Sequence, residues 1–479
     1  MFNVALDPSL PQPLHRQLYD AWRASILAGL SAPGDRAPSS RELAASLGVS
    51  RSTVNQCYQD LVSEGYLEPR RGAGTYVCQL PDRLHAPVPQ TRAAAMRAPA
   101  FSAYGRALCA VAPPPPPAPS GVISFRQWRP ATDRFPHVEW SRYLARQARH
   151  GKRERFDYST DLLGQRKLRE AIARYLGRSR AVRASPGQVL IVNGSQHALD
   201  LIARVLLDRG DRVGVEDPGY WGARACFSAY GARLTPVPVD DSGMRTRALP
   251  RNLKLLYVTP SHQFPTGAAL SLARRLELLD WANSSGTMIV EDDYDSEYRY
   301  VGRPLPALQG LGDGGQVLYA GTFSKVMFPA LRIGFLVLPP ALVETFARAR
   351  WLTDRQSNAV EQLALAAFID DGCLERHIRR MRKLYGARLD ALRTALDGAF
   401  GPRVKIAGES AGMHVMIRLQ TKLPDAEVAR RALRAGVEVV CARDNYLRPR
   451  DTGEFILGFS DLPERSIAEG IARLARALP

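Results

Sequence analysis

The stretch GTFSKVMFPALRIGF, residues 321–335, decides how the rest of the chain is interpreted. Lys325 follows the end of an apolar run and has hydroxyl groups nearby at Thr322 and Ser324 and a guanidinium at Arg332. An amine can condense with an aldehyde, while two hydroxyls and a guanidinium can hold a dianionic phosphate about one lysine side chain away. The stretch therefore suits a ligand that carries both an aldehyde and a phosphate. Taken alone, Lys325 would be an ordinary surface lysine, so the remaining sequence has to decide between the two interpretations.

Apolar runs that end in polar residues surround this stretch from residue 121 to the C-terminus. Buried parallel strands are continuous runs of Val, Ile and Leu, and ligands bind beyond their carboxyl ends. We therefore expect an α/β domain over residues 121–479, with its site at one edge of an open sheet. The segments that contain these runs are residues 189–207, 211–227, 253–267, 287–298 and 317–327.

Two of these strand ends carry candidates for phosphate and ring contacts. Ser195 and Gln196 stand where a strand passes into a helix, and free backbone N–H groups at a helix start bind phosphate. Tyr220, in EDPGYWG, is an aromatic side chain that could lie flat on a ligand ring. A tyrosine packed in the core is the alternative interpretation of that position.

Asp292 and Tyr294, in VEDDYDSEY, form a sharper signal. A pyridine nitrogen that stays protonated needs a fixed carboxylate partner, and a phenolate-like ring oxygen needs a hydroxyl donor. Asn193, His262 and Gln263 could add polar contacts near such a ring. Clustered carboxylates also suit a divalent metal, but no matching ligand set occurs elsewhere in the sequence, so we expect no metal.

Length and composition limit the number of domains and the class of protein. The 479 residues exceed one ordinary domain, so we expect at least two. No apolar run is long enough to cross a bilayer and no signal-peptide pattern is present, which predicts a cytoplasmic protein. The six cysteines are scattered without metal-type spacing and are expected to be free thiols. The formal charge of +18 suggests nucleic acid as a partner, but residues 1–78 hold seven Arg and seven Asp plus Glu, so the excess lies beyond them.

The N-terminal segment has the pattern of a helix-turn-helix. Residues 13–30 place leucine, tryptophan and isoleucine at intervals of four, as in an amphipathic helix. In SSRELAASLGVSRSTV, Ser39 or Ser40 can cap a short helix, Gly48 makes the turn, and Ser50 caps a second helix.

The start of the second helix is the expected DNA contact, because the N-terminal residues of a recognition helix reach the major groove. The exposed candidates there are Arg51, Ser52, Thr53 and Asn55. The following EPRRGAGTYV predicts a β-hairpin wing. A small helical cap with a solvated polar face is the alternative.

Residues 79–120 are expected to form a linker between residues 1–78 and residues 121–479. Periodicity is lost, and the segment ends in VAPPPPPAPSG, whose five consecutive prolines favour an extended spacer. The spacer would allow the two domains to lie apart.

The segments SSRELAASLGVSRSTV, EGYL and RRGAGTYV together resemble the GntR-type winged helix. This resemblance implies that Arg41, together with the four residues of the second helix, faces DNA, and that Arg71 and Gly72 form the tip of the wing. The order of features in residues 121–479 resembles the fold type I aminotransferases, which bind pyridoxal 5'-phosphate. The whole chain resembles the MocR subfamily of GntR regulators, through VTPSHQFPTG, EDDYDSEYRY and GTFSKVMFPALRIG.

The second resemblance assigns a role to each residue of the expected site. It implies that Lys325 forms the internal aldimine, Asp292 pairs with the pyridine nitrogen, Tyr294 bonds the ring hydroxyl, and Tyr220 stacks on the ring. The phosphate would be held by Ser195, Gln196, Thr322, Ser324 and Arg332. A carboxylate of the effector would meet Arg443 or Arg224, both of which could equally be solvated surface arginines.

Two further features bear on function. Gln127 and Trp128 stand where relatives usually have a Pro-Gly pair, and the bulky Trp128 is expected to reshape the pocket. Residues 377–396 predict a strongly basic helix with one apolar stripe. Its positive face is interpreted as solvated, with a second contact to the DNA backbone as the alternative.

These observations predict a PLP-dependent transcriptional regulator, a homodimer that binds operator DNA and senses PLP, an amine or an amino acid at Lys325. A working aminotransferase with an accessory DNA-binding module is the main alternative. A DNA-binding protein with a cofactor-free second domain is a third hypothesis. Effector, target genes and the sign of regulation do not follow from the sequence.

Overall fold

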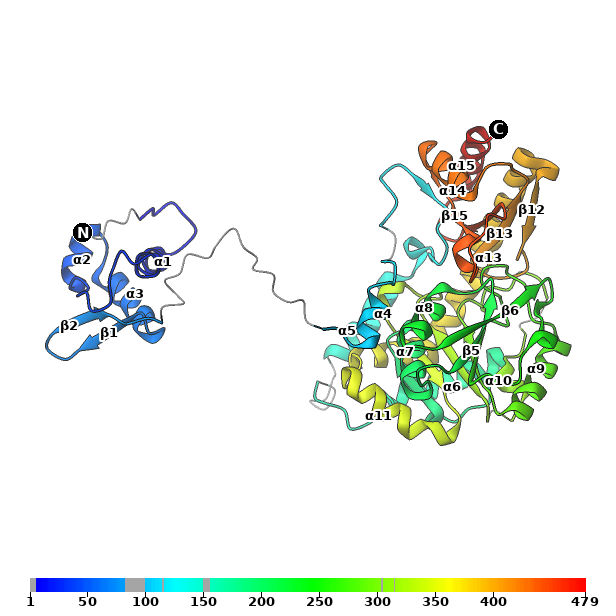
Figure 1. Cartoon of the computed structure of the whole chain (residues 1–479), viewed down its shortest axis with the longest axis horizontal. Helices are drawn as coiled ribbons and strands as arrows, with labels where there is room; N and C mark the ends of the chain where they lie inside the picture. The colour runs from blue at the N-terminus through cyan, green and yellow to red at the C-terminus, as the bar shows by residue number, and fades with distance from the viewer. Residues whose placement is uncertain (1–5, 82–99, 114–115, 150–155, 303–304, 314) are drawn as a thin grey trace. The chain divides into compact units, whose positions relative to one another are not determined.

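The computed structural model describes residues 6–81, 100–113, 116–149, 156–302, 305–313 and 315–479. The chain divides into two compact units, Met1–Ala100 and Phe101–Pro479 (Figure 1). Each unit has its own buried core, and each is described here by itself.

The small unit is a three-helix bundle with a β-hairpin. Its elements are α1 (Leu14–Leu27), α2 (Ser40–Leu47), α3 (Arg51–Ser63), β1 (Leu67–Arg70) and β2 (Gly74–Val77). One cluster of buried side chains, including Leu18, Trp22, Val54 and Leu61, joins the three helices to the hairpin. The first helix is shorter than the predicted range 13–30. It ends at Leu27 because Gly29 takes a positive φ of 72°, and this leaves Leu30 82% exposed.

The turn between α2 and α3 follows the predicted chemistry. The Ser39 hydroxyl accepts a bond from the Glu42 N–H at 3.2 Å, and the Glu42 carboxylate accepts one from the Ser39 N–H, which completes a capping box. Gly48 ends α2 in the left-handed conformation, and Ser50 caps α3 by accepting from the Thr53 N–H. A helix-turn-helix followed by a hairpin, the winged arrangement, is therefore confirmed.

The large unit is built on an eight-stranded mixed sheet with the order β4-β11-β10-β9-β8-β5-β6-β7. Strands β5, β8, β9 and β10 run parallel to one another, whereas β11 is antiparallel to both β10 and β4. The five segments predicted as strands form β4, β5, β8, β9 and β10. The strand bounds are β4 (Val189–Val192), β5 (Arg212–Asp217), β6 (Arg233–Asp240), β7 (Gly243–Met244), β8 (Leu255–Val258), β9 (Met288–Asp293), β10 (Val317–Thr322) and β11 (Gly334–Val337).

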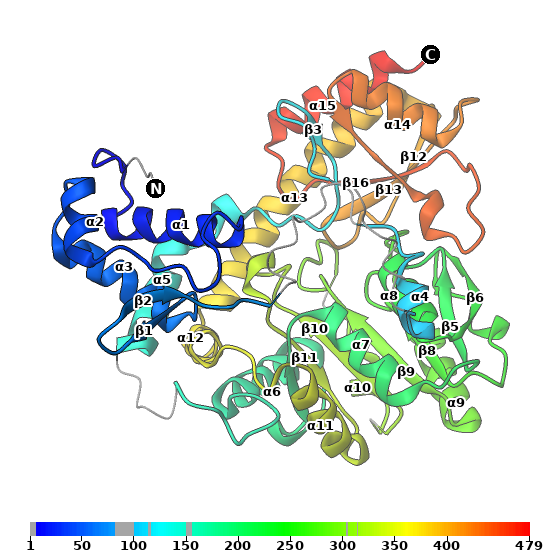
Figure 2. The same ribbon diagram turned by 60° about the vertical axis from the view of Figure 1, so that its left-hand side comes forward.

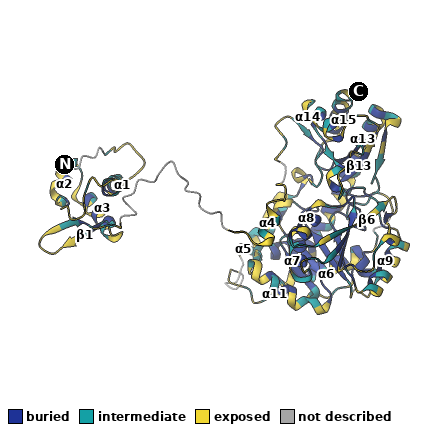
Figure 3. Cartoon of the chain, in the orientation of Figure 1, coloured by how far each residue is buried: buried dark blue, intermediate teal, exposed yellow. Residues whose placement is uncertain are grey.

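Helices cover both faces of this sheet. Alternate residues of β4 show the division: Val189 and Ile191 join one cluster of buried side chains, and Leu190 and Val192 join another. The first cluster includes residues of α6, α12 and α13, and the second includes residues of α7 and α8. Figure 3 shows the buried strands inside a shell of helices with exposed outer faces. The bounds of the helices that precede residue 373 are α5 (His137–Arg149), α6 (Arg166–Arg180), α7 (Ser195–Leu206), α8 (Trp221–Ala229), α9 (Leu272–Ser285), α10 (Leu308–Leu311), α11 (Val343–Asp354) and α12 (Ala359–Asp370).

A second, four-stranded sheet with the order β12-β13-β16-β15 completes the large unit. Its strands are β12 (Val404–Ala407), β13 (His414–Leu419), β16 (Glu454–Gly458) and β15 (Val440–Cys441), and β14 (Val437–Glu438) pairs with β3 (Ile123–Ser124). The long helix α13 (Cys373–Phe400) leads into this part of the fold, where α14 (Asp425–Arg434) and α15 (Glu464–Ala477) also lie (Figure 2).

The segment predicted as a linker contains a short helix, α4 (Ala103–Leu108). Its Tyr104 ring meets the Tyr230 ring beside α8 at 4.8 Å between centroids, so this helix is anchored to the large unit. The expectation of an extended spacer over all of residues 79–120 is therefore wrong at α4. Residues 82–99 and two of the five prolines lie outside the described residues. Among the residues that the structure describes, no helix is long and apolar enough to cross a membrane, and all six cysteines are free.

Candidate functional site

A cavity of about 170 Å³ opens at the carboxyl ends of the strands of the large sheet. All nine residues predicted to hold a cofactor line it. They are Ser195, Gln196, Tyr220, Asp292, Tyr294, Thr322, Ser324, Lys325 and Arg332. Trp128, which was expected to reshape the pocket, lines it as well. Sequence reasoning missed four further lining residues, namely Tyr257, Thr259, Phe264 and Pro329.

Residues 321–335 form a hairpin that carries four of the nine predicted residues, namely Thr322, Ser324, Lys325 and Arg332. Strands β10 and β11 pair from Tyr319–Val337 to Thr322–Gly334, and the connection between them holds the lysine and the arginine. Gly321 is needed within β10, since an added Cβ would come within 2.3 Å of the Phe335 ring. The hairpin therefore carries an amine, two hydroxyls and a guanidinium on one continuous segment.

Lys325 provides the amine that lines the cavity. Burial lowers the pKa of its amine to about 8, against the opposing attraction of the Asp295 and Asp292 carboxylates. The amine donates to the backbone carbonyl of Trp128 at 3.3 Å and lies 5.7 Å from the centre of the indole ring. The lowered pKa increases the fraction of neutral amine near neutral pH, and the neutral amine is the form that acts as a nucleophile.

Asp292 is a buried carboxylate of the site, on β9 beside β10, the strand that precedes Lys325. One oxygen accepts a hydrogen bond from the Tyr257 hydroxyl at 2.7 Å. The other oxygen is buried and has no partner among the described groups. Burial raises the pKa of this carboxyl to about 6. A carboxylate oxygen left unpaired in a cavity costs free energy unless a ligand donates to it, so the protonated ring nitrogen of PLP fits this position.

The opposite end of the cavity suits a phosphate. Gly194, with φ of 91°, precedes α7, so the N–H groups at the start of that helix are available. The Arg332 guanidinium donates to the Asn193 carbonyl at 2.6 Å, and a Cβ at Gly194 would lie 3.1 Å from it. The Thr322 hydroxyl donates to that of Ser324 at 3.1 Å. Helix N–H groups, hydroxyls and a guanidinium together form a donor set for a dianion, so the residues present fit PLP at both ends.

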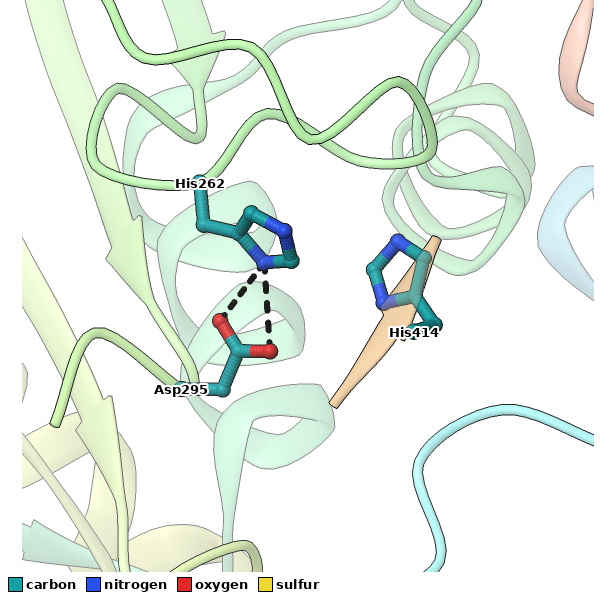
Figure 4. A group of neighbouring side chains, drawn as sticks. All are labelled: His262, Asp295 and His414. Carbon is teal, nitrogen blue, oxygen red and sulfur yellow. Dashed lines mark hydrogen bonds and ion pairs between the residues drawn. The ribbon is translucent and has the colours of Figure 1, made fainter. Parts of the chain in front are cut away.

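Tyr294 reaches the cavity from the end of β9, and its hydroxyl donates to the His262 carbonyl at 2.9 Å. The His262 imidazole meets the Asp295 carboxylate at 2.9 Å between Nδ1 and Oδ1 (Figure 4). The other oxygen of Asp295 accepts from the Met413 N–H at 3.1 Å, which ties the end of β9 to the second sheet. The predicted polar group at His262 therefore supports Tyr294 and does not itself line the cavity.

His262, Asp295 and His414 offer ligand atoms within 4.8 Å of one another (Figure 4). Hydrogen bonds already use one nitrogen of each ring, because the His414 Nε2 lies 3.2 Å from the Pro265 carbonyl. A Cβ at Gly412 would lie 1.9 Å from the His262 ring, so the space beside that ring is filled. The cluster is accordingly a packed hydrogen-bonded group that joins the two sheets.

Trp128 closes one wall of the cavity. Its backbone has a φ of 68°, a conformation that favours glycine, and its ring lies 4.8 Å from Phe264 and 5.4 Å from Tyr220 between centroids. Trp128, Phe264 and Tyr220 therefore form an aromatic wall of the cavity. That Trp128 reshapes the pocket relative to its relatives stays a prediction.

The two arginines predicted to bind an effector carboxylate do not line the cavity. Arg224, on α8, is buried and donates to the Asp444 carbonyl, and burial lowers the pKa of its guanidinium. Arg443 donates to the Asp451 carboxylate at 2.8 Å. Asn193 and Gln263 are likewise absent from the lining.

The predicted DNA-contact residues lie on the small unit as expected. Arg41, Arg51, Ser52 and Asn55 are exposed, and Thr53 is half-buried with its hydroxyl 2.8 Å from that of Ser50. Arg71 and Gly72 are exposed in the turn between β1 and β2, where Gly72 has a φ of 73°.

Comparison with known proteins agrees with the description of both the small and the large unit. The family model for bacterial regulatory proteins of the gntR family matches residues 14–77, and that for aminotransferase class I and II matches residues 134–473. The probable rhizopine catabolism regulatory protein MocR of Rhizobium meliloti is 40% identical, over 99% of this chain and 95% of its own length. The pyridoxine biosynthesis transcriptional regulator PdxR of Corynebacterium glutamicum is 32% identical over 99% of this chain and 98% of its own.

Among solved structures, the kynurenine aminotransferase of Pyrococcus horikoshii, in complex with PMP, has a TM-score of 0.70 and 32% identity. The match covers 75% of this chain and 91% of that protein. A GntR winged helix joined to a fold type I aminotransferase-like unit defines a class of DNA-binding regulators. The chain belongs to this class as a member of the MocR subfamily of GntR regulators.

Proposed function

We propose that this regulator binds pyridoxal 5'-phosphate at Lys325 and uses the occupied cavity to sense PLP, an amine or an amino acid. The observation that carries the proposal is the unpaired, buried oxygen of Asp292 in the same cavity as a lysine whose amine has a lowered pKa. The PMP present in the similar kynurenine aminotransferase supports the same cofactor class.

When bound, PLP supplies an aldehyde that condenses reversibly with amines. Lys325 provides the amine, and Asp292 holds the proton of the ring nitrogen. Ser195, Gln196, Thr322, Ser324 and Arg332 bind the phosphate, Tyr294 bonds the ring hydroxyl, and Tyr220 packs on the ring. An amine effector would compete with Lys325 for the aldehyde and thereby change the charge and contacts in the cavity.

Sensing requires that the ligand favour one state of the protein. A ligand shifts DNA affinity only by its difference in binding free energy between two states, typically about 1–3 kcal/mol. The winged helix would bind a DNA operator with Arg41, the exposed start of α3 and the wing tip. We propose a homodimer, because helix-turn-helix proteins usually bind paired half-sites. We still propose Arg443 and Arg224 as contacts for an effector carboxylate. This requires that Asp451 release Arg443 and that the Asp444 carbonyl release Arg224.

The direct test uses the purified full chain. PLP should give a yellow protein, and borohydride reduction should fix the cofactor on the peptide that contains Lys325. Lys325→Ala should abolish both signals, whereas Lys405→Ala, at an exposed strand position, should change neither. Operator binding should then respond to PLP or to an added amine in the wild type and not in Lys325→Ala.

An aminotransferase with an accessory DNA-binding module is the second candidate, favoured by the likeness to the kynurenine aminotransferase. Sustained conversion of an amino donor and a keto acid at about 1 s⁻¹ or faster, with no change in DNA binding, would favour the enzyme. Slow or single turnover together with altered DNA binding would favour the sensor.

A further inference from the structure

The positive charge of this protein lies outside its winged helix. Residues 1–78 hold equal numbers of basic and acidic residues, seven of each, whereas the whole chain carries a formal charge of +18. Residues 79–479 therefore carry all of the excess. A DNA-binding unit without net charge gains little from the release of counterions beyond its few local contacts, while phosphate neutralisation supplies most non-specific affinity for DNA.

Helix α13 concentrates this charge on one exposed face. Its buried stripe, which includes Ile378, Met381 and Tyr385, packs into the core, so the opposite face meets solvent. Four basic side chains follow one another there at helical spacing, and all four are exposed. They are Arg376, Arg379, Arg380 and Lys383, and we call them the α13 basic face.

The α13 basic face lacks the acidic neighbours on its own helix that several other helices have. On α14 and α15, for example, arginines pair with glutamates one turn away, as in Glu427–Arg431 and Glu469–Arg473. Between residues 376 and 389, α13 contains no acidic residue. Like charges four positions apart, as in Arg379 and Lys383, destabilise a helix by a few tenths of a kcal/mol. A face that only needed to be solvated would gain from acidic residues at these positions.

Two members of this face lack partners within the part of the chain that the structure describes. Neither Arg379 nor Lys383 takes part in a hydrogen bond or ion pair there. Of the nearby acidic groups, Glu375 is paired with Arg178 at 2.6 Å and Glu409 with Arg393 at 2.7 Å.

The surface is also hollowed along the helix. A groove of about 650 Å³ is lined by the α13 basic face together with Leu384 and Ala387. A second hollow shares Arg379 and Lys383 and adds further arginines of the same surface, namely Arg299, Arg382 and Arg393. A groove lined with guanidinium groups fits an anionic polymer better than a small neutral ligand.

We infer that the α13 basic face binds the phosphodiester backbone of the DNA that the winged helix recognises. Arg376 and Lys383 are seven residues apart, which spans about 10 Å of helix. Each strand of B-DNA carries one phosphate per about 3.4 Å of axis, so a face of this length can lie along about three phosphates of one strand. This contact rests on the proposed DNA-binding function and adds a second, sequence-independent surface to it.

The test is the salt dependence of DNA binding by the full chain, measured with a long duplex of random sequence. Arg379→Gln combined with Lys383→Gln removes two partnerless charges and relieves their repulsion, so the fold is not at risk. The slope of log K against log salt should become shallower by about 1.8, because each phosphate that the protein no longer neutralises reduces the slope by about 0.9. The matched control is Arg247→Gln with Arg251→Gln. Both arginines are exposed, Arg247 in η5 (Thr246–Ala248) and Arg251 three residues beyond its end, and their replacement should leave the slope unchanged.

Each outcome separates this inference from the proposed function. Equal slopes for the α13 variant, the control and the wild type would overturn the inference while leaving DNA binding intact. An equally shallower slope in the α13 variant and in the control would show an effect of total charge, and this result would also overturn the inference. Failure of the wild type to bind any duplex would refute the proposed function itself. The PLP absorbance of both variants should match the wild type, since neither pair lines the cavity.

Discussion

At the scale of single residues, the buried charge of Asp292 lowers the stability of the folded chain, while the same charge is expected to bind the ligand. Burial raises the pKa of its carboxyl to about 6 from an ordinary value of 3.8. Above pH 6 the group is ionised in both the folded and unfolded states, and the folded chain bears a cost of about 3 kcal/mol. Below about pH 4 the group is protonated in both states, so the cost disappears as the pH falls through this window.

Asp292→Asn should therefore stabilise the cofactor-free chain at pH 8 and have little effect at pH 4, as followed by thermal unfolding. The same variant should bind PLP more weakly, because the amide cannot hold a protonated ring nitrogen. Asp280→Asn, an exposed substitution on α9, serves as the control and should leave stability unchanged. A variant that was destabilised at pH 8 would show that the carboxylate is not a buried, uncompensated charge.

Lys325 should reveal its lowered pKa in the kinetics of cofactor capture. The neutral amine is the reactive form, and burial lowers its pKa from 10.5 to about 8. The rate of PLP capture should rise with pH to a plateau, with a midpoint near pH 8, as measured by stopped-flow absorbance. A rate that still rose tenfold per pH unit above pH 9 would indicate an unperturbed amine.

At the scale of elements, the recognition helix depends on its cap. The Ser50 hydroxyl accepts from the Thr53 N–H at 3.2 Å at the start of α3. Ser50→Ala should destabilise the small unit by about 1 kcal/mol and weaken operator binding, because the cap also orients the residues that face DNA. Ser63→Ala, at the other end of α3, should do neither. Equal unfolding midpoints for the Ser50 and Ser63 variants would contradict this role.

Prediction from sequence worked best where the chemistry is local. The strands, the caps of α2 and α3, and the nine cavity residues all follow strong short patterns that end in polar side chains. Tyr257 was missed because its bond to Asp292 depends on the pairing of β8 with β9. The reversed direction of β11, and the anchoring of α4 through Tyr104, likewise depend on distant segments. Arg224 and Arg443 were placed by resemblance, and loop carbonyl and carboxylate groups hold them elsewhere.

At the scale of the whole molecule, the two units have separate cores. The cluster that includes Leu18, Trp22 and Leu61 contains no residue beyond Leu80 among the described side chains. Thermal unfolding should therefore show two transitions by calorimetry. PLP at about a hundred times its Kd should stabilise only the large unit, by about 2.7 kcal/mol, and so raise only its transition. One transition that moves as a whole would indicate that the units unfold together.

The β10–β11 hairpin has a further consequence for how the cavity tolerates motion. Thr322 ends β10, and Ser324, Lys325 and Arg332 lie in the connection to β11, so a shift of the β10–β11 hairpin carries the amine, the hydroxyls and the guanidinium together. Their mutual spacing is preserved, and only their distance to Asp292 and to the start of α7 changes. Thermal displacement of the hairpin thus changes how tightly the ligand is held. It does not change the relative positions of the amine, hydroxyls and guanidinium that recognise the ligand.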